Sequence, residues 1–224
     1  MDQNNLKIFN GYVTRQDRHR LNRHRSGVVW FTGLPGAGKS TLAHLVEKEL
    51  FNHGVRAYVL DGDNVRYGLN ADLGFSREHR KENLRRITEV CKLLVDAGIV
   101  VLCAFISPYQ EDRDYARERF AGDLFVEIFV KCSLEECLRR DPKGNYKKAL
   151  TGIVQNYTGI SAPYEEPANP DLVLETDAMS LAQSVAQVLE LLNHSGLGWT
   201  AGHREQAAEA ALPGSTSSLP VIPS

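Results

Sequence analysis

The sequence predicts an α/β fold in which helices cover both faces of a five-stranded, mainly parallel sheet, giving three layers. Three observations predict it. Short apolar runs alternate with amphipathic runs from residue 28 onward. The 224 residues are 42% hydrophobic and 24% charged, which is a globular composition. A glycine-rich segment also joins the first apolar run to a helical run, as in nucleotide-binding α/β proteins.

Five short apolar runs are the strand candidates. Each has the length of a buried strand and is followed by turn residues or by an amphipathic stretch. They span 28–32, 57–60, 99–105, 125–130 and 172–174.

Helices are expected between these strands. One follows the glycine-rich segment, and another places apolar residues between 84 and 95 on one face and ends at Gly98. Ser133 with Glu136, and Ser180 with Gln183, have the spacing of capping boxes. Helices should therefore begin near 134 and 181.

One main domain is expected at 27–194, after an N-terminal arm at 1–26 and before a disordered, Ala/Gly/Ser/Pro-rich tail at 195–224. The net charge of −2 argues against nucleic-acid binding. No apolar stretch is long enough to cross a membrane. The four cysteines form no Cys-x-x-Cys pair and are expected to be buried thiols of a cytoplasmic protein.

The segment from Gly33 to Thr41 matches the phosphate-binding pattern G-x-x-x-x-G-K-[ST] between a strand and a helix. Its amide groups and the helix N-terminus would hold a nucleoside triphosphate. Lys39 would reach the β- and γ-phosphates, and the Ser40 hydroxyl would ligate Mg²⁺. The expected ATP-binding residues are Gly33, Leu34, Pro35, Gly36, Ala37, Gly38, Lys39, Ser40 and Thr41.

Two carboxylates follow the second strand candidate. Asp61 is placed to hold Mg²⁺ or to accept a proton from an attacking hydroxyl, and Asp63 to orient the acceptor. The alternative is an ordinary Asp-Gly turn with solvated carboxylates.

Two basic clusters follow. They suggest an anionic acceptor held from both sides, although a solvated helix face also explains part of the first cluster. The clusters are Arg66, Arg77, Arg80, Lys81, Arg85 and Arg86, and then Arg139, Arg140, Lys143, Lys147 and Lys148.

From about 27 to 192 the chain resembles the adenylyl-sulfate kinases, which transfer the γ-phosphoryl group of ATP to the 3′-hydroxyl of adenosine 5′-phosphosulfate. A weaker likeness extends over 14–25. The matching pieces are GVVWFTG at 27–33, DGDNVR at 61–66, LGFS at 73–76, RKEN at 80–83, FISP at 105–108, KG at 143–144, YKK at 146–148, YTGI at 157–160 and PYE at 163–165.

The resemblance implies a three-layer P-loop kinase with a mobile lid at about 139–160, using ATP and Mg²⁺ to make 3′-phosphoadenylyl sulfate for sulfate assimilation. Ser107 matches a serine often assigned as a phosphoryl carrier, with a substrate hydrogen bond or a plain Ser-Pro turn as alternatives. Lys39, Asp61 and Ser107 are the catalytic candidates, and Ser40 and Asp61 the metal ligands. The implied acceptor contacts are Asp63, Asn64, Arg66, Phe75, Arg80, Asn83, Ile106, Ser107, Lys143 and Tyr157.

The chain departs from the family pattern in and after the lid. Asn145 replaces the usual Leu, Leu150 the usual Arg and Ser161 the usual Asp, while Tyr157 replaces a Phe and keeps the ring. These departures leave open a kinase of the same build acting on another nucleotide-like or sugar acceptor, and a nucleotide-binding switch is a further alternative. The family resemblance also implies a homodimer and an ATP sulfurylase partner.

Overall fold

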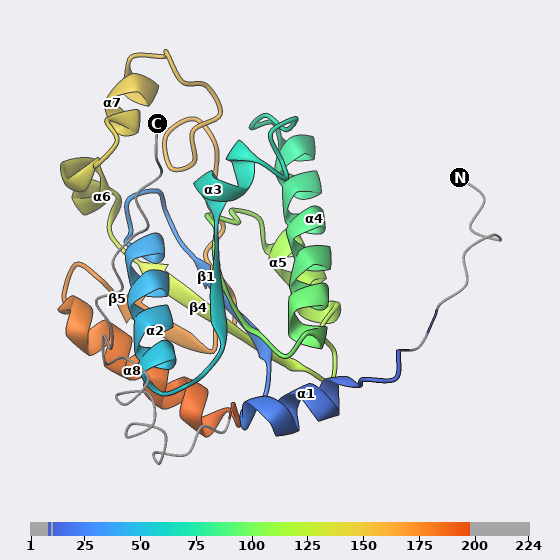
Figure 1. Ribbon diagram of the computed structural model, residues 1–224. Coiled ribbons are helices and arrows are strands. Elements are labelled where there is room, and N and C mark those ends of the chain that lie inside the picture. The colour runs from blue at the N-terminus through green and yellow to red at the C-terminus, as the bar shows by residue number, and fades with distance from the viewer. Residues whose placement is uncertain (1–8, 10, 198–224) are drawn as a thin grey trace, which may run out of the picture.

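A five-stranded sheet, parallel throughout, lies at the centre of the computed structural model, which describes residue 9 and residues 11–197 (Figure 1). The strand order is β2-β3-β1-β4-β5. Most of the expected tail and the first residues of the expected arm lie outside the described residues. The strands are β1 (Gly27–Thr32), β2 (Ala57–Asp61), β3 (Val100–Ala104), β4 (Leu124–Lys131) and β5 (Leu172–Glu175). The five predicted strands are therefore confirmed within a few residues at each end.

Eight helices are present in the described part of the chain, and four of them cover the two faces of the sheet (Figure 1). The helices α2 and α8 pack on one face, and α4 and α5 on the other. The bounds are α1 (Arg15–Asn22), α2 (Lys39–Asn52), α3 (Gly62–Tyr67), α4 (Arg77–Asp96), α5 (Gln110–Glu118), α6 (Leu134–Arg140), α7 (Asn145–Leu150) and α8 (Leu181–His194).

The two faces of the sheet form two apolar cores. Side chains alternate along β1, so that Val29 and Phe31 pack toward α2 and α8 while Val28 and Trp30 pack toward α4 and α5. All six β1 residues are buried because helices cover both faces. Trp30 adds two aromatic contacts, with ring centroids 5.8 Å from Phe105 and 6.0 Å from Phe125.

The parallel arrangement brings the carboxyl ends of the strands to one edge. Gly27 of β1 pairs in register with Val100 of β3 and Leu124 of β4, so these strands run side by side in the same direction. The loops after Thr32, Asp61 and Ala104 therefore emerge at the same edge, where open α/β sheets bind ligands.

The predicted helix starts differ in how completely they are capped. Ser180 and Gln183 form a reciprocal capping box at the start of α8, as expected. At α6 the Ser133 side chain accepts from the Glu136 amide, but the return bond is missing. Asp177 accepts from the Ser133 amide instead, and the Glu136 carboxylate binds two arginines of its own helix. The expected box at 133–136 is thus only half formed.

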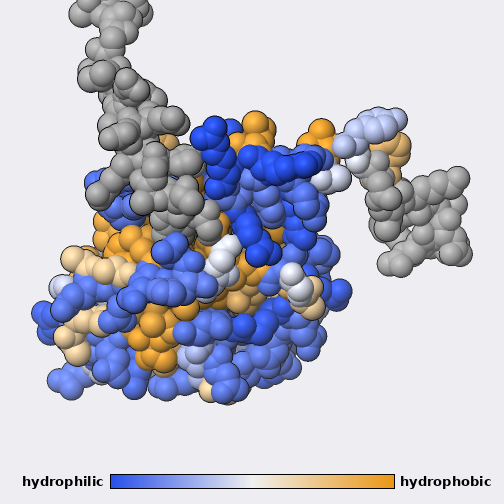
Figure 2. All heavy atoms as spheres, turned by 90° about the horizontal axis from the view of Figure 1, so that it is seen from below, coloured by the Kyte–Doolittle hydropathy of each residue, from blue (hydrophilic) through white to orange (hydrophobic). Residues whose placement is uncertain are grey.

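The short helix α1 crosses the end of the molecule opposite to those loops (Figure 1). Arg15 lies 2.8 Å from Asp123, Arg18 lies 3.3 Å from Asp96, and the Asn22 side chain donates to the Gly98 carbonyl. Hydrophilic residues cover much of this end, and apolar residues appear there as separate patches (Figure 2). Within the described ranges, no helix is both long and apolar enough to span a membrane. All four cysteines are free and buried, as predicted.

Candidate active site

The phosphate loop has the backbone that its glycines allow. Gly33 has φ 151°, and a Cβ at this position would lie 2.4 Å from the carbonyl oxygen of Val130 on the neighbouring strand. Gly38 has φ 106° and precedes the first turn of α2. Side chains rarely adopt either conformation, so the glycines let the loop close tightly over the N-terminus of α2.

Lys39 lies inside this loop. Its Nζ donates to the carbonyl oxygens of Gly33 at 2.9 Å and Leu34 at 2.7 Å. Burial lowers the pKa of Lys39 to about 8, because the charged form loses its hydration. The ammonium group is thus held at the loop, where a phosphate would restore a counter-charge.

Ser40 and Asp61 meet at the edge of the sheet. The Ser40 hydroxyl donates to Asp61 Oδ2 at 2.5 Å, and the amide of Asp63 donates to the other carboxylate oxygen. Among the residues that the structure describes, no group of three or more His, Cys, Asp and Glu side chains could hold a metal. One hydroxyl and one carboxylate do fit Mg²⁺, which takes few protein ligands and completes its shell with water and substrate phosphates.

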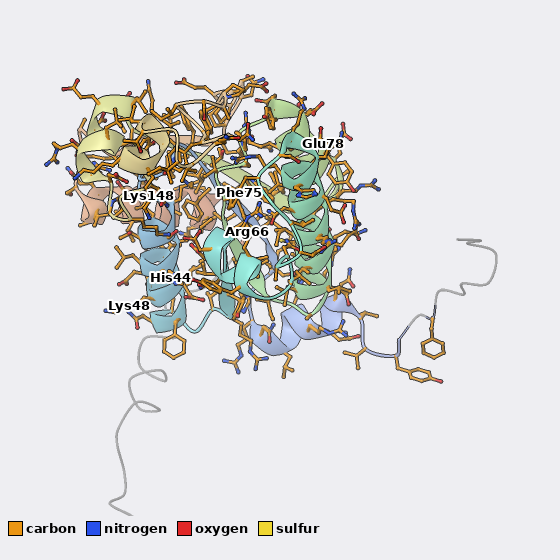
Figure 3. The ribbon with its side chains drawn as sticks, turned by 90° about the horizontal axis from the view of Figure 1, so that it is seen from above. His44, Lys48, Arg66, Phe75, Glu78 and Lys148 are labelled. Atoms are coloured by element: carbon orange, nitrogen blue, oxygen red, sulfur yellow. The ribbon has the colours of Figure 1, made fainter. Side chains whose placement is uncertain are left out.

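An aromatic ring with two arginines forms the second half of the site. Arg66 lies over the ring of Phe75, with its guanidinium carbon 4.5 Å from the ring centroid, and Arg80 lies 5.8 Å from it. Arg66 also donates to the carbonyls of Leu73 and Gly74, which fixes the loop between α3 and α4. Burial lowers the pKa of both arginines from the usual value. Figure 3 shows Arg66 and Phe75 side by side next to α4.

Asn83 of α4 is oriented by a residue that the sequence reasoning missed. The fully buried Asn70 donates from Nδ2 to Asn83 Oδ1 at 3.0 Å. With its oxygen occupied, Asn83 has its own amide hydrogens free for a ligand in the cavity. Asn70 carries no motif, and only the fold brings it to Asn83.

The Ser107 hydroxyl is engaged inside the protein. Its Oγ accepts from Trp30 Nε1 at 3.1 Å and donates to Thr32 Oγ1 at 2.9 Å. The residue is 3% exposed and has φ 38°, in the left-handed region. The neighbouring Ile106 and Pro108 border the cavity, together with Ser107 itself.

The segment 139–160 lies over the phosphate loop and contains α7. Its Tyr146 is buried, donates to the Pro35 carbonyl at 2.9 Å, and contacts the ring of Tyr157 edge-on at 5.0 Å. Asp141 accepts from the amides of Tyr146 and Lys147 at the start of α7. Lys143 forms an ion pair with Asp63 across the site. Burial raises the pKa of Tyr157 to about 12, so its hydroxyl stays protonated.

These groups surround one cavity of about 410 Å³. Fourteen of the predicted site residues line it: Pro35, Gly36, Lys39, Ser40, Asp61, Asp63, Arg66, Phe75, Arg80, Asn83, Ile106, Ser107, Lys143 and Tyr157. The other predicted residues, which do not line the cavity, are Gly33, Leu34, Ala37, Gly38, Thr41 and Asn64.

Loop residues that the sequence reasoning did not single out also line the cavity. They include Asp141, Val154, Gln155 and Asn156. The Asn156 carbonyl accepts from Arg80 at 2.7 Å, which joins the segment 139–160 to α4. No sequence signal marks these positions, because loops contribute through backbone groups and proximity.

The two basic clusters contribute unequally to the cavity. Of their members, only Arg66, Arg80 and Lys143 line it. All five other arginines of the clusters bind acidic neighbours: Arg77 binds Glu111, Arg85 binds Glu82, Arg86 binds Asp72 and Glu82, and both Arg139 and Arg140 bind Glu136. Lys148 lies on the other side of the site from Arg66 (Figure 3) and does not line the cavity.

Comparison with known proteins gives a consistent result. The profile of the family described as adenylylsulphate kinase matches residues 25–175. The adenylyl-sulfate kinase of Thermodesulfovibrio yellowstonii is 56% identical over 189 residues, covering 84% of this chain and 94% of its own. The structure of the Mycobacterium tuberculosis APS kinase CysC in complex with AMPPNP and APS is similar with a TM-score of 0.74 and 51% identity, covering 76% of this chain and 99% of that one. The hexameric APS kinase from Thiobacillus denitrificans has a TM-score of 0.59 and 32% identity, covering 81% of this chain and 32% of that one.

Proposed function

The chain belongs to the adenylylsulphate kinase family, and from this we propose that it transfers the γ-phosphoryl group of ATP to the 3′-hydroxyl of adenosine 5′-phosphosulfate. The products would be ADP and 3′-phosphoadenylyl sulfate, which serves sulfate assimilation. The observation that carries the proposal is that the phosphate loop and the pocket of Phe75, Arg66 and Arg80 open into the same cavity. Two ligands held there can meet without leaving the protein.

On the ATP side, the loop at 33–41 binds the phosphates through its amide groups and the N-terminus of α2. Lys39 is already inside the loop and would turn from the carbonyls of Gly33 and Leu34 toward the terminal phosphates. Ser40 and Asp61 would hold Mg²⁺, which would supply charge neutralisation to the phosphates.

On the acceptor side, Phe75 and Tyr157 offer rings for stacking on a base, a contact typically worth about 1–3 kcal/mol. Arg66 and Arg80 neutralise the phosphosulfate, and Asn83 donates to the base or ribose. Asp63 orients the attacking hydroxyl, in a position where Lys143 also reaches. Positioning and charge neutralisation of this kind are the main contributions that enzymes make to phosphoryl transfer.

Ser107 is better explained as part of the acceptor wall than as a phosphoryl carrier. Both its donor and one acceptor position are used by Thr32 and Trp30, and the hydroxyl is buried. Direct in-line transfer between the two bound ligands needs no covalent relay. The buried hydroxyl therefore supports a direct mechanism.

The segment 139–160 would act as a lid. It reaches the phosphate loop through Tyr146, the acceptor side through Lys143 and Asn156, and it is exposed along much of its length. Closure over both ligands would exclude water, which otherwise competes for the phosphoryl group.

Location and assembly are also part of the proposal. Four buried free thiols support a reducing, cytoplasmic environment. We also propose a homodimer and a functional link to an ATP sulfurylase, the source of the acceptor. The resemblance of residues 27–192 to the family implies both the homodimer and the ATP sulfurylase link.

An acceptor panel tests the proposed activity. Purified protein with ATP and Mg²⁺ is given adenylyl sulfate, other nucleotides and sugars in a coupled ADP assay, with Lys39→Ala as the control. We expect ADP and 3′-phosphorylated product in equal amounts with adenylyl sulfate, and a loss of about 10²-fold or more in Lys39→Ala, since removing a charge-stabilising group typically costs this much. Turnover with adenylyl sulfate no faster than in the control would refute the activity. Faster turnover with another acceptor would favour the alternative that Asn145, Leu150 and Ser161 left open.

A further inference from the structure

Arg113 of α5 is a fully buried arginine that the proposed mechanism does not use. It is 1% exposed and is not among the residues that line the cavity. Its guanidinium group donates from Nη1 to the Ser107 carbonyl at 2.6 Å and from Nη2 to the Glu165 carbonyl at 2.8 Å. On the opposite side its Nε lies 2.9 Å from Glu127 Oε1 of β4, as a close ion pair.

Stability alone is a weak reason for this arrangement. Taking an arginine and a carboxylate out of water costs free energy, and replacing such a pair by apolar residues is often neutral or stabilising. A buried pair with fixed geometry is best explained by what it holds in place. Here it holds two carbonyl groups, Ser107 and Glu165.

The first of these carbonyls belongs to a strained turn. Ser107 has φ 38°, a conformation that residues other than glycine adopt only where the surroundings hold them. Its side chain is fixed by Trp30 and Thr32, and its carbonyl by Arg113. The turn presents Ile106 and Pro108 to the cavity on either side.

The second carbonyl belongs to a segment that lies against the same turn. The Glu165 amide donates to the Pro108 carbonyl at 2.8 Å, and the Gln110 amide donates to the Glu165 carboxylate at 2.7 Å. The buried Arg113 therefore joins the turn at 106–108 to Glu165, and the two hydrogen bonds between Glu165 and residues 108 and 110 join the same segments. Eight residues before Glu165, the chain passes through Tyr157 at the cavity.

We propose that Arg113, paired with Glu127, is a positioning residue for the acceptor: it fixes the turn at 106–108, which lines the cavity, and ties that turn to the segment at 163–166, which contacts the turn but does not itself line the cavity. This inference rests on the proposed function, because it assigns the turn to the acceptor rather than to ATP. Arg113 touches no part of the phosphate loop in the described contacts.

Arg113→Lys tests the proposal, with Arg117→Lys as the matched control. Lysine keeps the charge but cannot reach two carbonyls and a carboxylate at once. Arg117 is on the same helix, contacts the same Glu127 at 3.4 Å and also binds Asp171, yet makes no contact with the turn. In Arg113→Lys we expect KM for adenylyl sulfate to rise at least tenfold and KM for ATP to stay within twofold. In Arg117→Lys both constants should stay within twofold.

Equal rises of both KM values in Arg113→Lys, or no change in either, would overturn the proposal. Thermal unfolding of each variant shows whether it is folded at the assay temperature. If Arg113→Lys is unfolded at the assay temperature, Glu127→Gln is used instead. Glutamine keeps the shape of the Glu127 side chain and leaves Arg113 its contacts with the Ser107 and Glu165 carbonyls. It removes the negative charge beside the Arg113 guanidinium group. In Glu127→Gln we expect KM for adenylyl sulfate to rise threefold or more while KM for ATP does not change. Equal rises in both KM values, or no change in either, would overturn the proposal.

A second measurement asks whether Arg113 acts through the turn. Arg113→Lys is combined with Ser107→Ala and, separately, with Ser107→Gly. Both lack the hydroxyl, but only glycine adopts φ 38° without strain. The factor by which Arg113→Lys raises KM for adenylyl sulfate should be at least threefold smaller in the glycine background, and equal factors would reject the turn as the route.

The proposed function and this inference can fail separately. If the wild type phosphorylates another acceptor, the same KM ratio is measured with that acceptor. If the wild type phosphorylates no acceptor, the proposed function fails. Arg113 is then tested by binding: in Arg113→Lys the dissociation constant for adenylyl sulfate should rise relative to that for AMPPNP.

Discussion

Arg66 and Arg80 both lie over Phe75, but they serve different neighbours. Arg66 binds the loop carbonyls of Leu73 and Gly74, whereas Arg80 binds the carbonyls of Phe75 and Asn156. Each still has guanidinium hydrogens left for an anion, because these bonds use only part of the five donors. Both arginines line the cavity on the acceptor side.

Arg66→Ala and Arg80→Ala should therefore raise KM for adenylyl sulfate much more than KM for ATP. A lost hydrogen bond to a charged group typically costs about 1.5–3 kcal/mol, or roughly 10- to 150-fold. Steady-state kinetics with each substrate varied in turn provides the measurement. Arg77→Ala is the control on the same helix, since Arg77 binds the exposed Glu111 and should change neither constant. Equal changes in both constants for Arg66→Ala would contradict the division of the cavity into two halves.

At the scale of single residues, the sequence predicted the residue types better than their partners. The phosphate-loop pattern predicted Lys39 and Ser40 as site residues, and both line the cavity, because spacing along the chain sets their positions in the loop. By charge alone Arg85 and Arg86 look the same as Arg80, yet of the three only Arg80 lines the cavity. A helix turns by about 100° per residue, so neighbouring arginines point to different sides.

At the scale of elements, the strands were predictable from their apolar runs, whereas the segment 139–160 was expected only from the family resemblance. The central strands β1 and β3 are buried and almost wholly apolar along their length because helices cover both faces of the sheet, which makes them stand out in the sequence. The six-residue helices α3 and α7 are too short to show a continuous run of buried apolar residues in the sequence. The start of α7 is instead determined by Asp141 and by the backbone hydrogen bonds around Gly144. These contacts join residues that are not helical neighbours, so the hydrophobic periodicity of the sequence does not predict them.

Tyr146 joins the segment 139–160 to the phosphate loop through its hydroxyl group, and this contact can be tested. Tyr146→Phe removes the bond to the Pro35 carbonyl while the ring keeps its contact with Tyr157. The loss of a neutral hydrogen bond, about 1 kcal/mol, should raise KM for ATP about fivefold and affect KM for adenylyl sulfate less. Tyr58→Phe, on the exposed side of β2, is the control and should leave both constants unchanged. An unchanged KM for ATP in Tyr146→Phe would show that this bond does not shape the nucleotide site.

The molecule as a whole is built on two apolar cores, one on each face of the sheet. Leu102 of β3 lies in the core under α2 and α8 and has no exposed surface. We expect Leu102→Ala to lower the free energy of unfolding by about 2–5 kcal/mol, because a cavity remains where the side chain was. Urea denaturation measures this value. Leu93→Ala, at a position 72% exposed on α4, should change it by no more than about 0.5 kcal/mol. If Leu102→Ala lowers the free energy of unfolding by less than about 1 kcal/mol, neighbouring core residues must have moved to fill the space that the leucine side chain left.

The burial of all four thiols has a practical consequence. A maleimide dye would find no accessible sulfur on the folded protein, so the chain provides an unreactive background without any removal of cysteines. Ile153, which is 74% exposed in the segment 139–160, could then be replaced by the substitution Ile153→Cys and labelled at that position alone. Fluorescence from this probe would follow, in real time, whether that segment shifts when each nucleotide is added.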